Sequence, residues 1–264
     1  MFAKSKTLAF AGITATACLV ATVAQAGPGW IVGLVDGKTI VIIDPATRKV
    51  TNKATINGAG MILGIDVRPA DGMLYGLAAD GAIVTIDVKS GQATVKSKLG
   101  ESWKQGVTTT FDFNPAADRL RLMSSEGTSL RINVDDGKAV VDGSHKYKDG
   151  DANAGKTPKV VAGAYSNSMK GTKATALYNI DAATGSLVSQ APPNDGVLNT
   201  IGSLGMTVSG PVAFNIVATG EDNNNAWLAS GGSLYSVDLK TGKATIAGKI
   251  EGLSGTLTDI AWID

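Results

Sequence analysis

The sequence has one cysteine, one histidine and almost no excess of charge of either sign. Cys18 lies near the N-terminus, so the remainder of the chain has no thiol with which to form a disulfide. A single histidine, His145, excludes a metal site built from several imidazoles. A Ser-His-Asp triad would have to use it, although the chain contains no G-x-S-x-G sequence. We therefore interpret His145 as an exposed loop residue.

The charge balance limits the classes of partner. The chain carries 24 Lys and Arg residues against 23 Asp and Glu residues. It lacks the basic excess typical of proteins whose main target is nucleic acid or an anionic membrane surface. Beyond residue 23 no apolar run is long enough to span a bilayer. We expect a protein, glycan or small ligand as partner, no nucleic acid, and no integral membrane span after removal of the N-terminal segment.

That segment has the features of a secretory signal peptide. An apolar stretch over residues 8–23 follows two lysines and precedes the small-x-small sequence Ala24-Gln25-Ala26. We predict a cleaved signal over residues 1–26 and a single domain over residues 27–264, periplasmic or secreted. A retained membrane anchor is the alternative, but the run is short for a spanning helix. Lipidation of Cys18 is a second alternative, although no Leu lies three positions before it.

Glycine is plentiful, with 33 residues, and one pattern recurs five times. In each copy β-favouring residues alternate, a short polar turn follows, and a second β-leaning run leaves it, which is typical of a hairpin. The copies are TIVIIDPATRKVT (39–51), AIVTIDVKSGQAT (82–94), SLRINVDDGKAV (129–140), ALYNIDAATGSLV (176–188) and SLYSVDLKTGKAT (233–245). We assign Asp44, Asp87, Asp181 and Asp238 to the turns, where a carboxylate accepts backbone N–H bonds. A period of roughly 40 to 50 residues with four strands per unit is typical of β-propeller blades.

The segments between the hairpins support this interpretation. MILGIDVRPADGMLYGL (61–77) and TTTFDFNPAADRLRLM (108–123) each predict an apolar inner strand, a turn and a second strand. LTDIAWID (257–264) predicts an inner strand with no second strand after it. WIVGLV (30–35) predicts a second strand with no inner strand before it. We predict an all-β propeller, with five four-stranded blades, closed by pairing of the N- and C-terminal strands. An open sandwich or a solenoid is the alternative, because the third and fourth units match the pattern poorly.

Several unusual loops occur together in one order. They are FDFNPAADRLR, LRINVDDG, DGDANAGKTPKV, AYSN and ALYNIDAATGSLVSQAPPNDGVLNTIGSLG. In this order and spacing they resemble the exported bacterial family catalogued as domain of unknown function 4394. The resemblance covers the chain from about residue 31 to its C-terminus and implies a propeller-like, extracytoplasmic domain. It implies no reaction and no catalytic residues.

One loop offers a candidate metal site. Asp149, Asp151 and Asn153 stand at alternating positions, a spacing that lets oxygens converge on a hard cation such as calcium. The twelve-residue calcium loop would need Gly and Glu where this chain has Ala154 and Val160. Calcium is the one cofactor that the sequence suggests, and a solvated, hydrogen-bonded loop is the alternative.

Three arginines form a candidate anion site. Arg119, Arg121 and Arg131 lie on adjacent predicted strands, and the first two share a face because strand side chains alternate. Guanidinium groups bind carboxylate, sulfate or phosphate in a bidentate manner. The alternative is that they pair with acidic residues nearby in the sequence.

Three functional hypotheses follow. The first is a non-enzymatic scaffold that binds a ligand or protein on one rim, because the chain shows no nucleophile with its base and no cofactor motif. The second is a calcium-assisted hydrolase or lactonase with its site at the propeller axis or rim. It needs acidic side chains from several blades to meet, yet the inner strands place Asp66, Asp112, Tyr165 or Ser166, Asn215 and Ala261 there. Two carboxylates at most make the enzyme the weaker hypothesis. The third is a structural module without a ligand.

Overall fold

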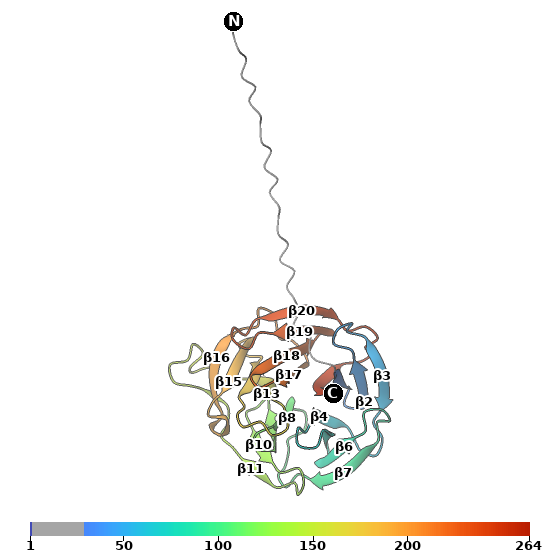
Figure 1. Cartoon of the computed structure of the whole chain (residues 1–264). Helices are drawn as coiled ribbons and strands as arrows, with labels where there is room; N and C mark the ends of the chain where they lie inside the picture. Colours follow the sequence, from blue (N-terminus) through green and yellow to red (C-terminus); the bar gives the residue numbers. More distant parts are fainter. Residues whose placement is uncertain (2–28) are drawn as a thin grey trace.

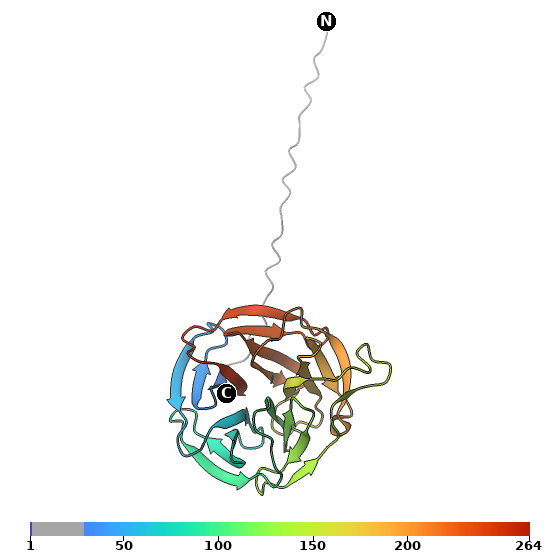
Figure 2. The same ribbon diagram turned by 180° about the vertical axis from the view of Figure 1, so that it is seen from behind.

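The computed structural model describes Met1 and residues 29–264, so the predicted signal peptide, apart from Met1, lies outside the described residues. Residues 29–264 form five sheets arranged in a ring, and their strand pairs are antiparallel except for one in blade 4 (Figure 1). Seen from behind, the ring is closed in the same way, and the C-terminus lies near its centre (Figure 2). The predicted five-bladed β-propeller is confirmed.

Blade 1 contains strands from both ends of the propeller. Its order is β21 (Leu257–Ile263), β1 (Trp30–Val35), β2 (Thr39–Ile43) and β3 (Val50–Thr55). β1 pairs antiparallel with β21, with Ile31 opposite Trp262, and a bulge separates Leu34 from Val35. The terminal strands therefore close the ring as the sequence predicts, and the innermost strand of this blade has its pairing partner.

Blades 2, 3 and 5 each consist of four consecutive strands running outward from the axis. Blade 2 contains β4 (Ile62–Val67), β5 (Leu74–Ala78), β6 (Ala82–Ile86) and β7 (Ala93–Lys98). Blade 3 contains β8 (Thr109–Asn114), β9 (Arg119–Ser124), β10 (Ser129–Ile132) and β11 (Ala139–Val141). Blade 5 contains β17 (Val212–Gly220), β18 (Asn223–Ser230), β19 (Ser233–Val237) and β20 (Ala244–Lys249).

Blade 4 differs from the expected four strands. It contains β13 (Val160–Tyr165), β14 (Leu177–Asp181), β15 (Ser186–Gln190), β16 (Val197–Ser203) and a fifth strand, β12 (Lys146–Tyr147), with a short 3-10 turn, η1 (Pro193–Asp195), between β15 and β16. β12 pairs in parallel with β16. The long segment between β11 and β13 passes along the outer edge of this blade and covers the backbone groups that an edge strand leaves unpaired.

The repeated acidic residues fold the outer hairpins. The Asp44 carboxylate accepts a hydrogen bond from the Ala46 N–H at 2.8 Å, and Asp238 accepts one from the Lys240 N–H at 2.8 Å. In the third copy Asn133 takes this position and accepts from the Asp135 N–H. Gly242 ends the last of these turns with φ +80°, a conformation that favours glycine. The turn interpretation of these aspartates agrees with the geometry.

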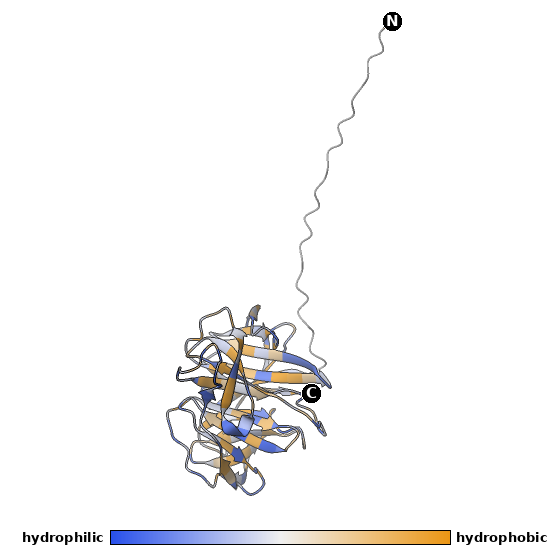
Figure 3. Ribbon diagram, turned by 90° about the vertical axis from the view of Figure 1, so that its left-hand side faces the viewer, coloured by the Kyte–Doolittle hydropathy of each residue, from blue (hydrophilic) through white to orange (hydrophobic). Residues whose placement is uncertain are grey.

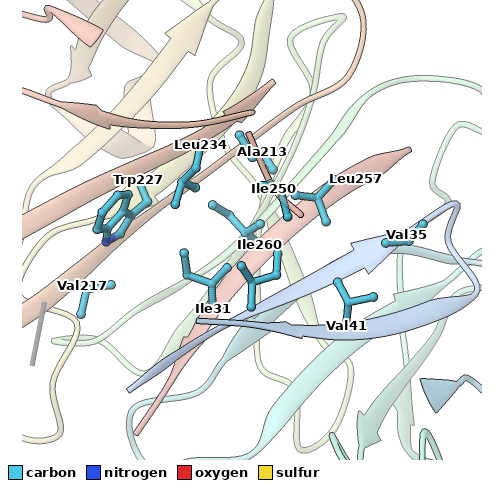
Figure 4. Close-up of a cluster of buried hydrophobic side chains, with 12 residues drawn as sticks. Ile31, Val35, Val41, Ala213, Val217, Trp227, Leu234, Ile250, Leu257 and Ile260 are labelled. Atoms are coloured by element: carbon cyan, nitrogen blue, oxygen red, sulfur yellow. The ribbon is translucent and has the colours of Figure 1, made fainter. Parts of the chain in front are cut away.

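The core lies between neighbouring blades. Figure 3 shows that many residues of the strands are hydrophobic. Between blades 5 and 1, Trp227 of β18 packs in one cluster with Ile31 of β1 and Ile260 of β21 (Figure 4). Such faces bury apolar surface only when the ring is closed, so neighbouring blades stabilise one another. Among the residues that the structure describes, none lies in a helix long and apolar enough to cross a membrane.

Candidate functional site

The inner strands place four polar side chains close to the axis. Asp66 comes from β4, Asp112 from β8, Asn215 from β17 and Asp259 from β21, and all four are buried. The expectation of at most two axial carboxylates is therefore wrong. Asp259 precedes Ala261 by two residues, so strand alternation places both on the same side of β21. That alternation was a signal by which the sequence could have revealed the third carboxylate.

Each axial carboxylate joins its blade to the next. Asp66 Oδ2 accepts a hydrogen bond from the Phe113 N–H at 2.8 Å, and Asp112 Oδ1 accepts one from the Tyr165 N–H at 2.8 Å. Asp259 Oδ2 accepts one from the Ile65 N–H at 2.9 Å. These N–H groups lie on inner strands, whose axial edge has no neighbouring strand of its own sheet. The carboxylates satisfy buried donors that would otherwise lack partners.

Burial makes these carboxyl groups difficult to ionise. It raises the pKa of Asp66 to about 7. Burial, followed by the charges of Asp66 and Asp259, raises the pKa of Asp112 well above its usual range. Burial likewise raises the pKa of Asp259, and the charge of Asp66 adds to it. The axis therefore favours protons or cations over further negative charge.

A pocket of about 340 Å³ opens where the inner strands end at one mouth of the axis. We call it the axial-mouth pocket. Asp66 and Asn215 contribute its most buried polar side chains, at 3% and 7% exposure. Asn215 Nδ2 donates to Asp66 Oδ1 at 3.4 Å, although their blades are separated in the ring by blade 1. The pocket is lined by Asp66, Val67, Pro69, Gly72, Ser168, Met169, Lys170, Asn215, Ile216, Val217, Ala218, Trp262, Ile263 and Asp264.

A larger pocket, of about 660 Å³, lies beside the β13–β14 loop, between blades 4 and 5. We call it the side pocket. Its polar side chains are largely bonded to one another: the Asn167 amide donates to Asp222 Oδ1 at 3.2 Å, and Asn224 Nδ2 donates to Asn167 Oδ1 at 2.9 Å. These bonds hold the loop to the β17–β18 hairpin. Despite its smaller volume, the axial-mouth pocket is the better candidate, because the side-chain oxygens of Asp66 and Asn215 on its floor can accept further hydrogen bonds.

The candidate calcium residues lie on the outer edge of blade 4. Asp151 accepts hydrogen bonds from the Thr200 N–H and the Thr200 hydroxyl, both at 2.6 Å. Asn153 Nδ2 donates to the Thr200 hydroxyl at 2.9 Å, whereas Asp149 is exposed and outside these contacts. The structure thus brings two of the three residues together, on Thr200 of β16. Within residues 29–264 no group of three or more His, Cys, Asp or Glu side chains is arranged to hold a metal ion. The calcium site stays a prediction.

Two of the three candidate anion-binding arginines share one carboxylate. Arg121 is 1% exposed, forms an ion pair with Asp142 and donates to Asn194 Oδ1 at 2.7 Å. Arg131 Nε donates to the same Asp142 at 2.8 Å. Arg119 lies apart and exposed. Asp142 follows β11 in a loop segment with no periodic pattern, so no sequence signal selects it.

His145 is half-buried rather than exposed. Its Nε2 lies 3.4 Å from the Met123 sulfur. Burial, followed by the charge of Arg121, lowers its pKa to about 4. The imidazole is therefore neutral at physiological pH and packs against the blade.

Two solved structures align with most of this chain, and the first of them shares its fold. A protein of unknown function from Bacteroides thetaiotaomicron VPI-5482 aligns with a TM-score of 0.54 and 14% identity, over 88% of this chain and 64% of that chain. A protein of unknown function from Bacteroides caccae aligns with a TM-score of 0.44 and 13% identity, over 90% of this chain and 99% of that chain. At such identities the likeness concerns the fold alone, and the present chain spans less than two thirds of the first protein's length. No curated protein matches significantly.

The sequence match to a family is more extensive. The profile of DUF4394, described as a domain of unknown function, matches residues 39–261. This range runs from β2 to β21 and includes all four axial polar residues. The chain belongs to the DUF4394 family.

Proposed function

We propose that this protein is a non-enzymatic binding scaffold that holds a small polar ligand in the axial-mouth pocket. One observation carries the proposal. Asp66 and Asn215, from blades that are not neighbours, meet at the floor of a pocket with mixed polar and apolar walls, and both are more than nine-tenths buried. Small-ligand sites commonly combine apolar walls with a few convergent polar groups.

The contacts of the axial carboxylates support binding over catalysis. Each of the three has an oxygen bonded to a backbone N–H of the following blade. A reaction that moved these oxygens away from the N–H groups would leave buried donors unmet, at a cost of about 1–3 kcal/mol for each. A binding role leaves these bonds intact.

We also propose that the scaffold acts outside the cytoplasm, in the periplasm or after secretion. The support is the apolar stretch of residues 8–23 followed by Ala24-Gln25-Ala26. Mass spectrometry of the mature protein from the producing cell would test this, since export with cleavage predicts Gly27 as the first residue. A chain that retains Met1 in the cytoplasm would contradict it.

A fragment screen by NMR tests the binding proposal. Trp262 lines the pocket and its indole N–H donates to Asp264 at 3.0 Å, so its resonance reports on occupancy. We expect small polar fragments to shift this signal in the purified protein. Asn215→Leu should abolish the shift by filling the floor with an apolar group, whereas Tyr178→Phe, in the side pocket, should leave it unchanged. No shift with any fragment, or equal shifts in Asn215→Leu, would overturn the proposal.

A further inference from the structure

The three axial carboxyl groups have no basic partner within residues 29–264. Asp66, Asp112 and Asp259 form no ion pair with any Lys, Arg or His of residues 29–264. The nearest buried arginines are directed elsewhere, Arg68 to Asp118 at 2.6 Å and Arg121 to Asp142. A buried carboxylate without a cationic partner gains from any cation that reaches it.

The pocket floor offers acceptors rather than donors. Asp66 Oδ1 receives a long 3.4 Å bond from the Asn215 amide, and Asp66 Oδ2 accepts from the Phe113 N–H. Asn215 contributes a second side-chain oxygen to the same floor. An ammonium group has three donors and no acceptor, which matches a carboxylate oxygen and an amide oxygen on one floor.

One part of the wall is apolar and suits a short apolar body. Val67, Pro69, Met169, Val217 and Trp262 surround the floor, and all but Val217 are partly exposed. The indole and the thioether are also favourable neighbours for a cation. Lys170 lies at the exposed rim, away from the buried floor.

We infer that the axial-mouth pocket recognises a primary ammonium group carried on a short apolar body, with Asp66 and Asn215 as its acceptors. The inference rests on the proposed binding function and names the ligand class. The ammonium replaces the long Asn215–Asp66 contact with short charge-assisted bonds and supplies the positive charge that the axis lacks.

Such binding depends on pH. Because burial raises the pKa of Asp66 to about 7, a bound ammonium must displace its proton below that pH. The other charged groups on this axis and pocket are Asp112, Asp259, Lys170 and Asp264. Burial also raises the pKa values of Asp112 and Asp259. Loss of their protons at higher pH would likewise favour a bound cation. Affinity should therefore rise between pH 6 and pH 8.

Isothermal titration with three probes tests the inference. The probes are butylamine, 1-butanol as a neutral molecule with the same body, and calcium chloride. We expect butylamine to bind at least about tenfold more tightly than butanol at pH 8, as a charge-assisted bond in a buried site provides. Its affinity should fall at pH 6. Asp66→Asn should remove both the preference and the pH dependence, and Lys170→Gln should strengthen butylamine binding by removing a like charge from the rim.

The outcomes separate the two proposals. If butanol binds as tightly as butylamine, and Asp66→Asn changes neither, the ammonium inference fails while the small-ligand pocket stands. If calcium binds and butylamine does not, the inference also fails and the axis is a metal site. If neither these probes nor any fragment shifts the Trp262 signal, both proposals fail. The pH dependence in the unmodified protein keeps the test valid if Asp66→Asn does not fold.

Discussion

Asp259 and Ile65 are 194 positions apart in the sequence, and the carboxylate of the first accepts a 2.9 Å hydrogen bond from the backbone N–H of the second. This bond joins β21, in blade 1, to β4, the first strand of blade 2. It lies on the side of blade 1 that faces away from blade 5. It therefore fastens the blade that closes the ring to its neighbour, and does so with a residue from the C-terminal strand.

We predict that Asp259→Ala destabilises the propeller by about 1–3 kcal/mol, because the buried Ile65 N–H loses its acceptor. Urea unfolding followed by circular dichroism would measure the change. Asp259→Asn is the matched control, since it keeps one side-chain oxygen as an acceptor and removes the titratable group. A loss in Asp259→Asn as large as in Asp259→Ala would argue against the Ile65 hydrogen bond as the source of the stabilisation.

The buried Arg121–Asp142 pair should be more sensitive than the exposed arginine on the same strand. Arg121→Met leaves Asp142 with Arg131 alone and removes donors from Asn194 and Tyr165. We expect a loss of about 3–5 kcal/mol in the free energy of unfolding. Arg119→Met should change it by less than about 0.5 kcal/mol. Equal effects of the two substitutions, measured by urea unfolding, would argue against a structural role for the buried pair.

Stability should depend on pH through Asp66. The folded state keeps a proton on Asp66 up to about pH 7, whereas the unfolded chain releases it near the ordinary aspartate pKa of 3.8. The folded state then binds more protons than the unfolded state. The stability that Asp66 contributes is therefore lost as pH rises from about 4 to about 7. Urea unfolding at a series of pH values should show a steeper fall for the unmodified protein than for Asp66→Asn. A parallel pH profile of the two proteins would contradict this prediction.

His145 acts in the opposite direction over part of the same range. Burial lowers its pKa to about 4, so the folded state keeps the imidazole neutral at pH values where the unfolded chain protonates it. The free energy of unfolding therefore falls as pH drops below 6.5. The comparison of Asp66→Asn with the unmodified protein cancels this contribution, because both contain His145. His145→Gln in both backgrounds provides a further check.

Calcium should not change the unfolding temperature. Both oxygens of Asp151 accept hydrogen bonds from Thr200, which leaves that carboxylate committed to holding the long segment against β16. We expect the same melting curve in EDTA and in saturating calcium. A reversible rise with calcium would instead establish a native-state metal site at Asp149, Asp151 and Asn153.

The sequence predicted the number of blades and their closure because both follow from local patterns. Hairpins repeat along the chain, and the two terminal segments each lack the strand that the other supplies. Asp66 and Asp112 could be placed at the axis because they occupy equivalent positions in two similar segments.

The remaining features of the site depend on geometry that no local pattern encodes. The approach of Asn215 to Asp66 requires the distance between blades that are not neighbours in a closed ring. Asp142 forms an ion pair with Arg121 because tertiary contacts set the path of the loop that carries Asp142.

A crystal structure of the protein with the tightest-binding fragment would show whether the axial-mouth pocket is the ligand site. We predict that the fragment lies between Asn215 and Trp262, with its donor group within hydrogen-bond distance of Asp66. A fragment bound only in the side pocket beside Tyr178 would contradict it.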